Sequence, residues 1–208
     1  MSDYNYKLKK ILIPKISDIK NINILELGVQ KGRSTKIFLE ICDANDGRLL
    51  SVDIDDCSSV SDNKRWKFLN TSDDNFDLIK KSINQKLDLI YLDTVHEAKH
   101  VEKIFYGYFN DLKNGGLFVI DDISHLPYTK NSERENFYCE INNRETFNKL
   151  LEIYHSNTDL LDLSFSFISS GLAIIEKKNE TQIKAPKKIL TKENSFKNLI
   201  RKMYFKIK

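Results

Sequence analysis

Long apolar runs are missing from the 208-residue sequence. No stretch approaches the roughly 18 uninterrupted apolar residues that a transmembrane helix requires. The N-terminal segment MSDYNYKLKKILIPK also lacks the apolar core and the small-residue cleavage site of a secretory signal. We therefore expect a cytoplasmic protein without a membrane-spanning helix.

Cysteine is scarce as well. Cys42, Cys57 and Cys139 are the only three, an odd number at no spacing typical of a metal site. They are expected to be buried or incidental thiols in a reducing compartment. Hydrophobic residues make up 40% of the sequence. That share is enough for a packed core in a chain of single-domain length.

The greater part of the chain also lacks an excess of basic residues. Residues 177–208 hold eleven of the 33 Lys and Arg residues but only two of the 30 acidic residues, Glu180 and Glu193. The first 176 residues therefore carry an excess of acids, which argues against a core that binds nucleic acid. We divide the chain into a domain of residues 1–178 and a basic tail of residues 179–208.

Short apolar runs alternate with segments of helical pattern along the first 120 residues. The runs that predict strands are 22–27, 49–53, 66–69, 87–93 and 117–120. Such alternation predicts parallel βαβ units, and near-continuous apolar strands predict an α/β sheet covered on both faces. Asn114-Gly115-Gly116 is expected to be a turn, and Pro14 interrupts a weak helical pattern at the start of the chain.

The pattern changes after residue 123. Segment 124–143 is polar and aromatic, and it is either an acceptor-binding loop that uses Tyr128, Phe137 and Tyr138 or a surface loop. A helix is expected over about 143–154. The last two apolar runs, 164–168 and 172–176, are close enough to form a hairpin, which predicts an antiparallel sheet edge.

The predicted strands end in polar residues. In open α/β sheets, ligands bind beyond the carboxyl ends of the strands. The residues there are Glu26, Gly28, Asp53, Ser72, Asp73, Asp93, His96, Asp121 and Asp122. Five consecutive strand ends that carry acids predict a functional site at this edge.

The first strand leads into Glu26-Leu27-Gly28-x-x-x-Gly32. Glycines at a strand-to-helix turn let the backbone approach a ligand closely. Gln30 replaces the middle glycine of the dinucleotide fingerprint, which argues against a nicotinamide-dependent dehydrogenase. Asp53 follows Gly28 by 25 residues, where an acid can accept hydrogen bonds from two ribose hydroxyls. The alternative is a tight turn followed by a solvated acid.

Four blocks of the sequence resemble the class I S-adenosylmethionine-dependent methyltransferases over about residues 20–176. The blocks are ILELGVQKGRST, LLSVDID, DLIYLDTVH and LKNGGLFVIDDI. Within that class the chain is most similar to small-molecule O-methyltransferases of the macrocin type and the cephalosporin-hydroxylase-like group, which share E-x-G-x-x-x-G-x-S, D-x-x-H and G-G-x-x-x-x-D-D. These motifs are present as Glu26 to Ser34, Asp93 to His96 and Gly115 to Asp122.

The resemblance implies a Rossmann-like methyltransferase fold with strand order 3-2-1-4-5-7-6 and S-adenosylmethionine as cofactor. It places Gly28 near the methionine moiety, Asp53 on the ribose, and Ser72 or Asp73 on the adenine. The implied cofactor site consists of Glu26, Gly28, Gly32, Ser34, Asp53, Ser72, Asp73 and Asp93.

Three carboxylates are expected at two neighbouring strand ends. Asp93 follows the fourth strand, and Asp121 and Asp122 end the fifth. Close carboxylates repel one another unless a cation lies among them, and oxygen ligands suit Mg²⁺. We therefore expect a magnesium site, as in the catechol-type enzymes that this arrangement resembles. The alternative is that Asp121 caps a turn and Asp122 is merely polar.

His96 lies three residues after Asp93 and is the expected catalytic base. An imidazole can accept a hydroxyl proton near neutral pH. Mg²⁺ would bind substrate oxygens while His96 removes the proton as oxygen attacks the sulfonium methyl group. A histidine without a functional role is the alternative. His100, His125 and His155 are expected to be surface or packing residues, with His125 the nearest of them to a substrate.

Residues 194–208, NSFKNLIRKMYFKIK, predict a basic amphipathic helix. Ser195 is its expected N-cap, and Phe205 interrupts its polar face. Such a helix either lies on an anionic membrane surface or docks on protein, including the partner of a homodimer.

Three function classes remain open from the sequence. The first is Mg²⁺-dependent O-methylation of a small molecule or sugar. The second is a non-catalytic or membrane-tethered binding module on the same fold. The third is a nucleic-acid methyltransferase, which the acidic body disfavours. The usual Asn/Asp-Pro-Pro-aromatic motif of that class is absent, because Asp93-Thr94-Val95-His96 stands in its place.

Overall fold

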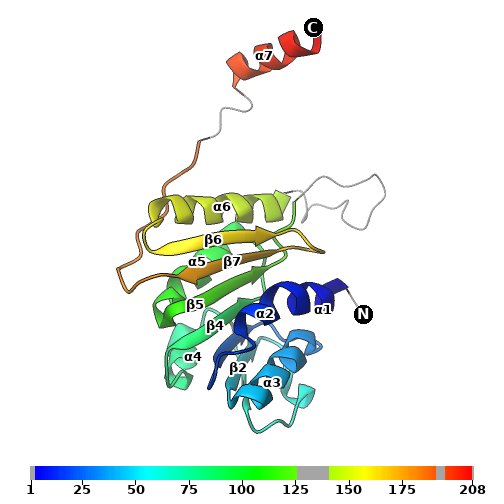
Figure 1. The fold of residues 1–208 in the computed structure, drawn as a ribbon, viewed down its shortest axis with the longest axis vertical. Coiled ribbons are helices and arrows are strands. Elements are labelled where there is room, and N and C mark those ends of the chain that lie inside the picture. The colour runs from blue at the N-terminus through cyan, green and yellow to red at the C-terminus, as the bar shows by residue number, and fades with distance from the viewer. Residues whose placement is uncertain (1–2, 126–140, 191–194, 208) are drawn as a thin grey trace.

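A seven-stranded sheet forms the centre of the computed structural model, which describes residues 3–125, 141–190 and 195–207. Its strand order is β3-β2-β1-β4-β5-β7-β6 (Figure 1). The strands are β1 Asn23–Leu27, β2 Arg48–Asp53, β3 Trp66–Asn70, β4 Leu87–Leu92, β5 Leu112–Asp121, β6 Leu161–Ser166 and β7 Leu172–Lys177. The first five pair in parallel, and β7 pairs antiparallel with both β5 and β6. The predicted fold class, strand order and antiparallel hairpin are confirmed.

Apolar side chains cover both faces of the central strands. On β1, Ile24 packs into one hydrophobic cluster while Leu25 and Leu27 pack into the other, since successive strand residues point to opposite faces. Every residue of β4 is buried. This two-sided burial explains why β1 and β4 appear in the sequence as nearly continuous apolar runs.

Helices lie on both faces of the sheet (Figure 1). They are α1 Asp3–Lys7, the π-helical turn Leu8–Leu12, α2 Ile13–Ile16, α3 Arg33–Asn45, α4 Phe76–Ser82, α5 Ala98–Tyr108, α6 Asn143–Ser156 and α7 Phe196–Ile207. Short 3₁₀ turns occupy Ser58–Val60 and Phe109–Asp111. Pro14 lies in the first turn of α2, a position that needs no backbone N–H donor, so the N-terminal segment is built from short pieces.

Strand β5 differs from its prediction. It begins at Leu112 and includes Asn114-Gly115-Gly116, which the sequence predicts as a turn. The pairing of β4 with β5 is irregular in this region, and Gly115 has a φ of 78°. A glycine in that conformation lets the chain bulge and still continue as a strand, which a turn prediction cannot anticipate.

Two segments of the prediction have different outcomes. Of segment 124–143, residues 126–140 lie outside the described part of the structure, and with them Tyr128, Phe137, Tyr138 and Cys139. Helix α7 forms as the sequence predicts, and it stands apart from the sheet and its covering helices (Figure 1). Among the described residues, no helix has the length and apolarity that crossing a bilayer would need.

Candidate functional site

A pocket of about 290 Å³ opens at the carboxyl ends of β1, β2, β4 and β5. Its lining residues are Gly28, Val29, Gln30, Lys31, Arg33, Ser34, Asp53, Asp93, Thr94, His96 and Asp122. A larger hollow of about 840 Å³ lies at the opposite edge, among the first residues of β1, β2 and β3. Arg65 in that hollow is paired with Asp43 and Asp46. Of the acids and the histidine that the sequence singles out, Asp53, Asp93, His96 and Asp122 line the strand-end pocket.

Two glycines shape the turn between β1 and α3. Gly28 has a φ of 97°, and a Cβ atom there would lie 2.0 Å from the carbonyl oxygen of Asp93. Gly32 has a φ of 68°, and its Cβ would lie 2.2 Å from Cγ1 of Val60. Both positions therefore require glycine. The close approach at Gly28 packs the turn against the segment that carries Asp93 and His96.

Asp53, at the end of β2, is held by the glycine turn. Its carboxylate accepts hydrogen bonds from the backbone N–H groups of Val29 at 2.7 Å, Gln30 at 3.0 Å and Asp55 at 3.0 Å. Burial opposes ionisation of Asp53, but these backbone donors outweigh it and lower its pKa. Asp53 also lines the pocket, so its carboxylate can face a hydroxyl group there.

Glu26 lies beneath the turn instead of lining the pocket. It is fully buried and accepts hydrogen bonds from Ser34, Thr35 and Ser51. Burial raises the pKa of Glu26 to about 7, although the three hydroxyl groups act in the opposite direction. Ser34 borders the pocket, but its hydroxyl is directed to Glu26. Both residues therefore support the turn from below.

Asp73 is also taken up by protein groups. It is buried, and its carboxylate accepts a hydrogen bond from the Thr94 hydroxyl at 2.6 Å and lies 2.8 Å from Nε2 of His100. The contact with Asp73 raises the pKa of His100. Ser72 donates to Asp74. Neither Ser72 nor Asp73 lines the pocket, and Asp73 reaches it through Thr94, which does.

Asp93, His96 and Asp122 come together in the pocket. One potential ligand atom from each lies within 4.8 Å of the other two. His96 Nε2 is 3.7 Å from Asp93 Oδ1 and 3.5 Å from Asp122 Oδ2. The side chains are 23–39% exposed, so they can reach a ligand. The Thr146 hydroxyl of α6 donates to the His96 carbonyl at 3.0 Å and fixes this loop.

Asp121 does not join this cluster, in contrast to the predicted trio of Asp93, Asp121 and Asp122. It is fully buried and contacts the ammonium group of Lys7 in α1, while the Tyr91 hydroxyl donates to it at 2.5 Å. The backbone N–H of Asp122 also donates to Asp121, at 2.6 Å. Asp122 follows the last residue of β5 and has a φ of 55°. Its carboxylate lies 3.6 Å from the Lys7 ammonium through one oxygen and 3.5 Å from His96 Nε2 through the other. The third member of the observed cluster is therefore His96 and not Asp121.

Several residues at the site are not predicted from the sequence. The sequence does not single out several residues that line the pocket, although they lie within its motifs. They are Thr94, next to Asp93, and Val29, Gln30, Lys31 and Arg33 in the glycine turn. Their closeness in sequence to the predicted site residues is the signal that could have found them. Lys7 gives no such signal, because 114 residues separate it from Asp121. His100, expected as a surface or packing residue, is half-buried and pairs with Asp73, a contact that the sequence does not indicate.

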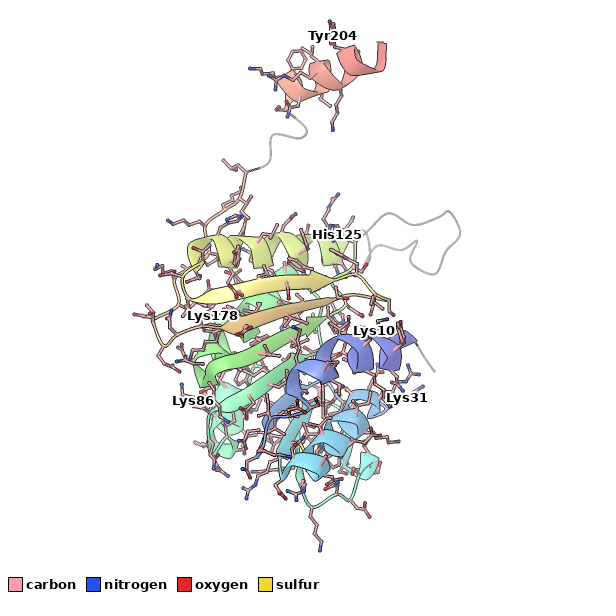
Figure 2. The ribbon with its side chains drawn as sticks, viewed as in Figure 1. Lys10, Lys31, Lys86, His125, Lys178 and Tyr204 are labelled. Atoms are coloured by element: carbon pink, nitrogen blue, oxygen red, sulfur yellow. The ribbon has the colours of Figure 1, made fainter. Side chains whose placement is uncertain are left out.

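Aromatic side chains lie beside the end of β5. His125 follows β5 and lies beside α6 (Figure 2), with its ring centre 4.6 Å from that of Phe147. Phe147 in turn lies 4.4 Å from Phe165. All three of these side chains are half-buried.

Comparisons with known proteins bear on the domain and its fold. Residues 25–123 match a family model described as a methyltransferase domain. The MycE methyltransferase of the mycinamycin biosynthetic pathway, solved with Mg, S-adenosylhomocysteine and mycinamycin VI, superimposes with a TM-score of 0.61 at 19% identity. That match covers 94% of this chain and 54% of MycE, so the chain spans about half of MycE's length. No curated protein matches the sequence.

Two further solved structures show how widely the fold is used. A Staphylococcus aureus protein assigned as a caffeoyl-CoA O-methyltransferase has a TM-score of 0.59 at 20% identity, covering 84% of this chain and 83% of that one. The N-methyltransferase NodS from Bradyrhizobium japonicum, bound to S-adenosylhomocysteine, has a TM-score of 0.56 at 15% identity, covering 86% and 89%. At these identities the similarity establishes the fold, and the acceptor must be argued from the site.

Proposed function

We propose that the chain is a class I S-adenosylmethionine-dependent methyltransferase, as the match of residues 25–123 to a methyltransferase domain supports, and that it transfers a methyl group to a hydroxyl of a small molecule or sugar with the help of Mg²⁺. One observation carries this proposal. Asp93, His96 and Asp122 converge in the same pocket as Asp53 and the Gly28 turn. A potential cation site and a potential base thus lie beside the expected cofactor site.

The residues present fit a divalent cation. Asp93 and Asp122 offer the carboxylate oxygens that Mg²⁺ prefers, within 4.8 Å of each other and of the His96 imidazole. When bound, Mg²⁺ would act as a Lewis acid on the acceptor oxygen and make its proton easier to remove. The MycE structures contain Mg, which supports the same assignment on a shared fold.

His96 is the proposed general base. Its Nε2 faces both carboxylates of the cluster, where it can accept the proton of an acceptor hydroxyl as that oxygen attacks the methyl carbon. Thr146 holds the His96 backbone, so the imidazole is positioned from α6 as well as from β4. Alignment of the acceptor oxygen with the methyl group supplies the remainder of the catalysis.

Asp53 and the glycine turn are the proposed cofactor contacts. Asp53 would accept a hydrogen bond from the ribose, and the Gly28 backbone would lie against the methionine moiety. Glu26, Gly32 and Ser34 support the turn, since Gly32 does not line the pocket and Ser34 donates to Glu26. Asp73 would contribute indirectly, because it accepts a hydrogen bond from Thr94, which lines the pocket.

The experiment is a methyl-transfer assay on the full chain. Methyl-labelled S-adenosylmethionine is supplied with a panel of glycosides, sugar nucleotides and catechols, in excess Mg²⁺ or in EDTA. We expect label transfer to at least one hydroxyl acceptor with Mg²⁺ and none with EDTA, whereas S-adenosylhomocysteine binding is retained in both. Asp122→Asn should behave as the EDTA sample does, and Glu97→Gln, an exposed neighbour of His96, should behave as the wild type does.

Two outcomes would contradict the proposal. Full activity in EDTA would show that the reaction needs no metal, and Asp93 and Asp122 would then have structural roles. Transfer only to nitrogen, or only to RNA, would reject a small-molecule hydroxyl acceptor while leaving the methyltransferase assignment intact.

A further inference from the structure

Helix α7 presents an apolar face that the described part of the body does not cover. Phe196, Leu199, Ile200, Met203 and Tyr204 are 45–80% exposed. At about 100° per residue these positions share one side of the helix. Figure 2 shows Tyr204 on α7, apart from the sheet and its covering helices. Exposed apolar groups in one contiguous stripe are typical of a surface that binds something.

The charge of the tail selects the kind of partner. Residues 195–208 contain five Lys and Arg residues and no acid. Lys197, Arg201 and Lys202 lie outside the apolar stripe by the same spacing. Apart from Asn198 and Phe205, the residues of α7 outside the apolar side are basic. A helix with one apolar side, a mainly basic remainder and no acidic residues matches the interface of an anionic lipid surface.

Protein partners fit these features less well. Two copies of α7 packed through their apolar faces would bring ten cations together, which costs free energy. In the described part of the body, the large exposed apolar residues outside the tail are scattered singly over separate elements, namely Tyr6, Ile54, Leu78 and Val95. They form no matching apolar surface on which the helix could dock.

The linker keeps the helix close to the body. Its backbone is fastened along α6, where Lys184 N donates to Asn157 at 2.7 Å, Lys187 N to Ser156 at 2.9 Å and Ile189 N to Glu152 at 3.2 Å. Only residues 190–194 separate this attachment from Ser195, a span of at most about 20 Å. A surface that binds α7 therefore lies close to the α6 side of the domain.

We propose that α7 binds the surface of an anionic membrane, with its apolar face among the acyl chains and its cations on the lipid phosphates, and so holds the methyltransferase domain at that surface. Leu199, Ile200 and Met203 provide the apolar contact. Arg201 and Lys202 provide salt-dependent attraction. The basic tail and the acidic body then have separate functions, attachment and chemistry.

The test is co-sedimentation of the full chain with vesicles. The wild type should pellet with vesicles that contain phosphatidylglycerol, much less with pure phosphatidylcholine, and less at high salt, because salt screens the charges. Ile200→Ser with Met203→Ser should weaken binding by about tenfold for each side chain. Arg201→Gln with Lys202→Gln should weaken it by about fivefold for each charge and reduce the salt dependence.

Controls separate a lipid surface from other partners. Asn198→Ser, on the polar side of α7, should leave binding unchanged, and the thermal unfolding of the body should be equal in all variants. Wild-type protein that stays in the supernatant with phosphatidylglycerol vesicles overturns the proposal. It is equally overturned if light scattering shows a dimer that Ile200→Ser with Met203→Ser dissociates, since α7 would then bind a second copy.

Discussion

Two rows of carboxylates lie at the same sheet edge, and they differ in what surrounds them. The inner row, Glu26, Asp73 and Asp121, is at most 6% exposed. The outer row consists of Asp53, Asp93 and Asp122, which line the pocket. In the outer row, the side chains of Asp93 and Asp122 are 25% and 39% exposed.

The inner carboxylates are satisfied by the protein itself. Glu26 has three hydroxyl donors, Asp73 has Thr94 and His100, and Asp121 has Lys7 and Tyr91. A buried charge requires such partners, and supplying them uses up the acceptor positions that a ligand would need. Chemistry is therefore expected in the outer row, and stability and positioning in the inner row.

The largest expected effect is that of replacing His96, which lies beside Asp93 and Asp122 of the outer row. His96→Ala should lower kcat by roughly 10²–10⁴-fold, the usual contribution of a positioned acid–base group. S-adenosylhomocysteine affinity should change little, because the proton comes from the acceptor. Steady-state kinetics measure this effect, with His155→Ala, an exposed histidine of α6, as the matched control.

A metal-ligand role for His96 would give a different pattern. Excess Mg²⁺ would then restore the turnover of His96→Ala, since only metal affinity would be lost. A wild-type rate per folded molecule would instead make His96 a packing residue. Either result would show that His96 is not the general base.

The next effect concerns the inner row. Lys7→Met should reduce the free energy of unfolding by about 3–5 kcal/mol, because it leaves the buried charge of Asp121 without its cation. Burial and the nearby charge of Asp93 raise the pKa of Asp121, and Lys7 opposes them. Lys10→Met, at an exposed position in the next turn, should stay within about 0.5 kcal/mol of the wild type.

Chemical denaturation measures both variants. Equal stabilities of Lys7→Met and Lys10→Met would show that the inner row does not depend on its buried ion pair. A selective loss at Lys7 would instead establish that an N-terminal helix, outside the matched residues 25–123, supports the site.

Local pattern accounts for what the sequence predicts well. Apolar runs of five or six residues fix β1, β2 and β4, and parallel pairing brings their carboxyl ends to one edge. The positions of Asp53, Asp93, His96 and Asp122 around one pocket follow from this. The hairpin of β6 and β7 follows from the short connection between two strands.

Side-chain direction and distant partners account for what the sequence misses. Asp121 and Asp122 are adjacent, yet Asp121 is enclosed with Lys7 and Tyr91. Asp122, just beyond the strand with a φ of 55°, reaches His96 as well as Lys7. Asp73 matches a cofactor position by order along the chain, yet His100 and Thr94 occupy its carboxylate. Partners 27 and 114 residues away leave no periodic signal.

The stability of the protein should depend on pH through Glu26 of the inner row. The pKa of Glu26 is raised to about 7 in the folded state, from 4.5. The native state then binds more protons than the unfolded state between these values, so stability is present below about pH 4.5 and is lost as pH rises to 7. The loss amounts to about 3 kcal/mol for this shift.

Glu26→Gln should flatten that part of the stability curve, since an amide does not titrate. Denaturant unfolding measured from pH 4 to 8 on both proteins gives the difference, with Glu40→Gln, an exposed glutamate of α3, as control. Parallel curves for the wild type and Glu26→Gln would show that Glu26 stays ionised, held by Ser34, Thr35 and Ser51.

The smallest expected effect tests the outer row at the cofactor. Asp53→Ala should weaken S-adenosylmethionine binding by about 1–3 kcal/mol, the scale of charge-assisted hydrogen bonds to hydroxyl groups. Asp53 also holds the N–H groups of Val29 and Gln30, so part of the loss comes from a looser turn. Asp53→Asn separates the two contributions, because it keeps one oxygen acceptor for the turn and removes the charge.

Calorimetry on Asp53→Ala, Asp53→Asn and the exposed control Asp55→Asn gives the order of affinities. If Asp53 binds the ribose, both Asp53 variants should bind more weakly than Asp55→Asn, which should match the wild type. If Asp53→Asn also matches the wild type while Asp53→Ala does not, the carboxylate serves the turn alone. Asp53 would then join Glu26, Asp73 and Asp121 as a supporting residue, and the outer row would be reduced to the cluster of Asp93, His96 and Asp122.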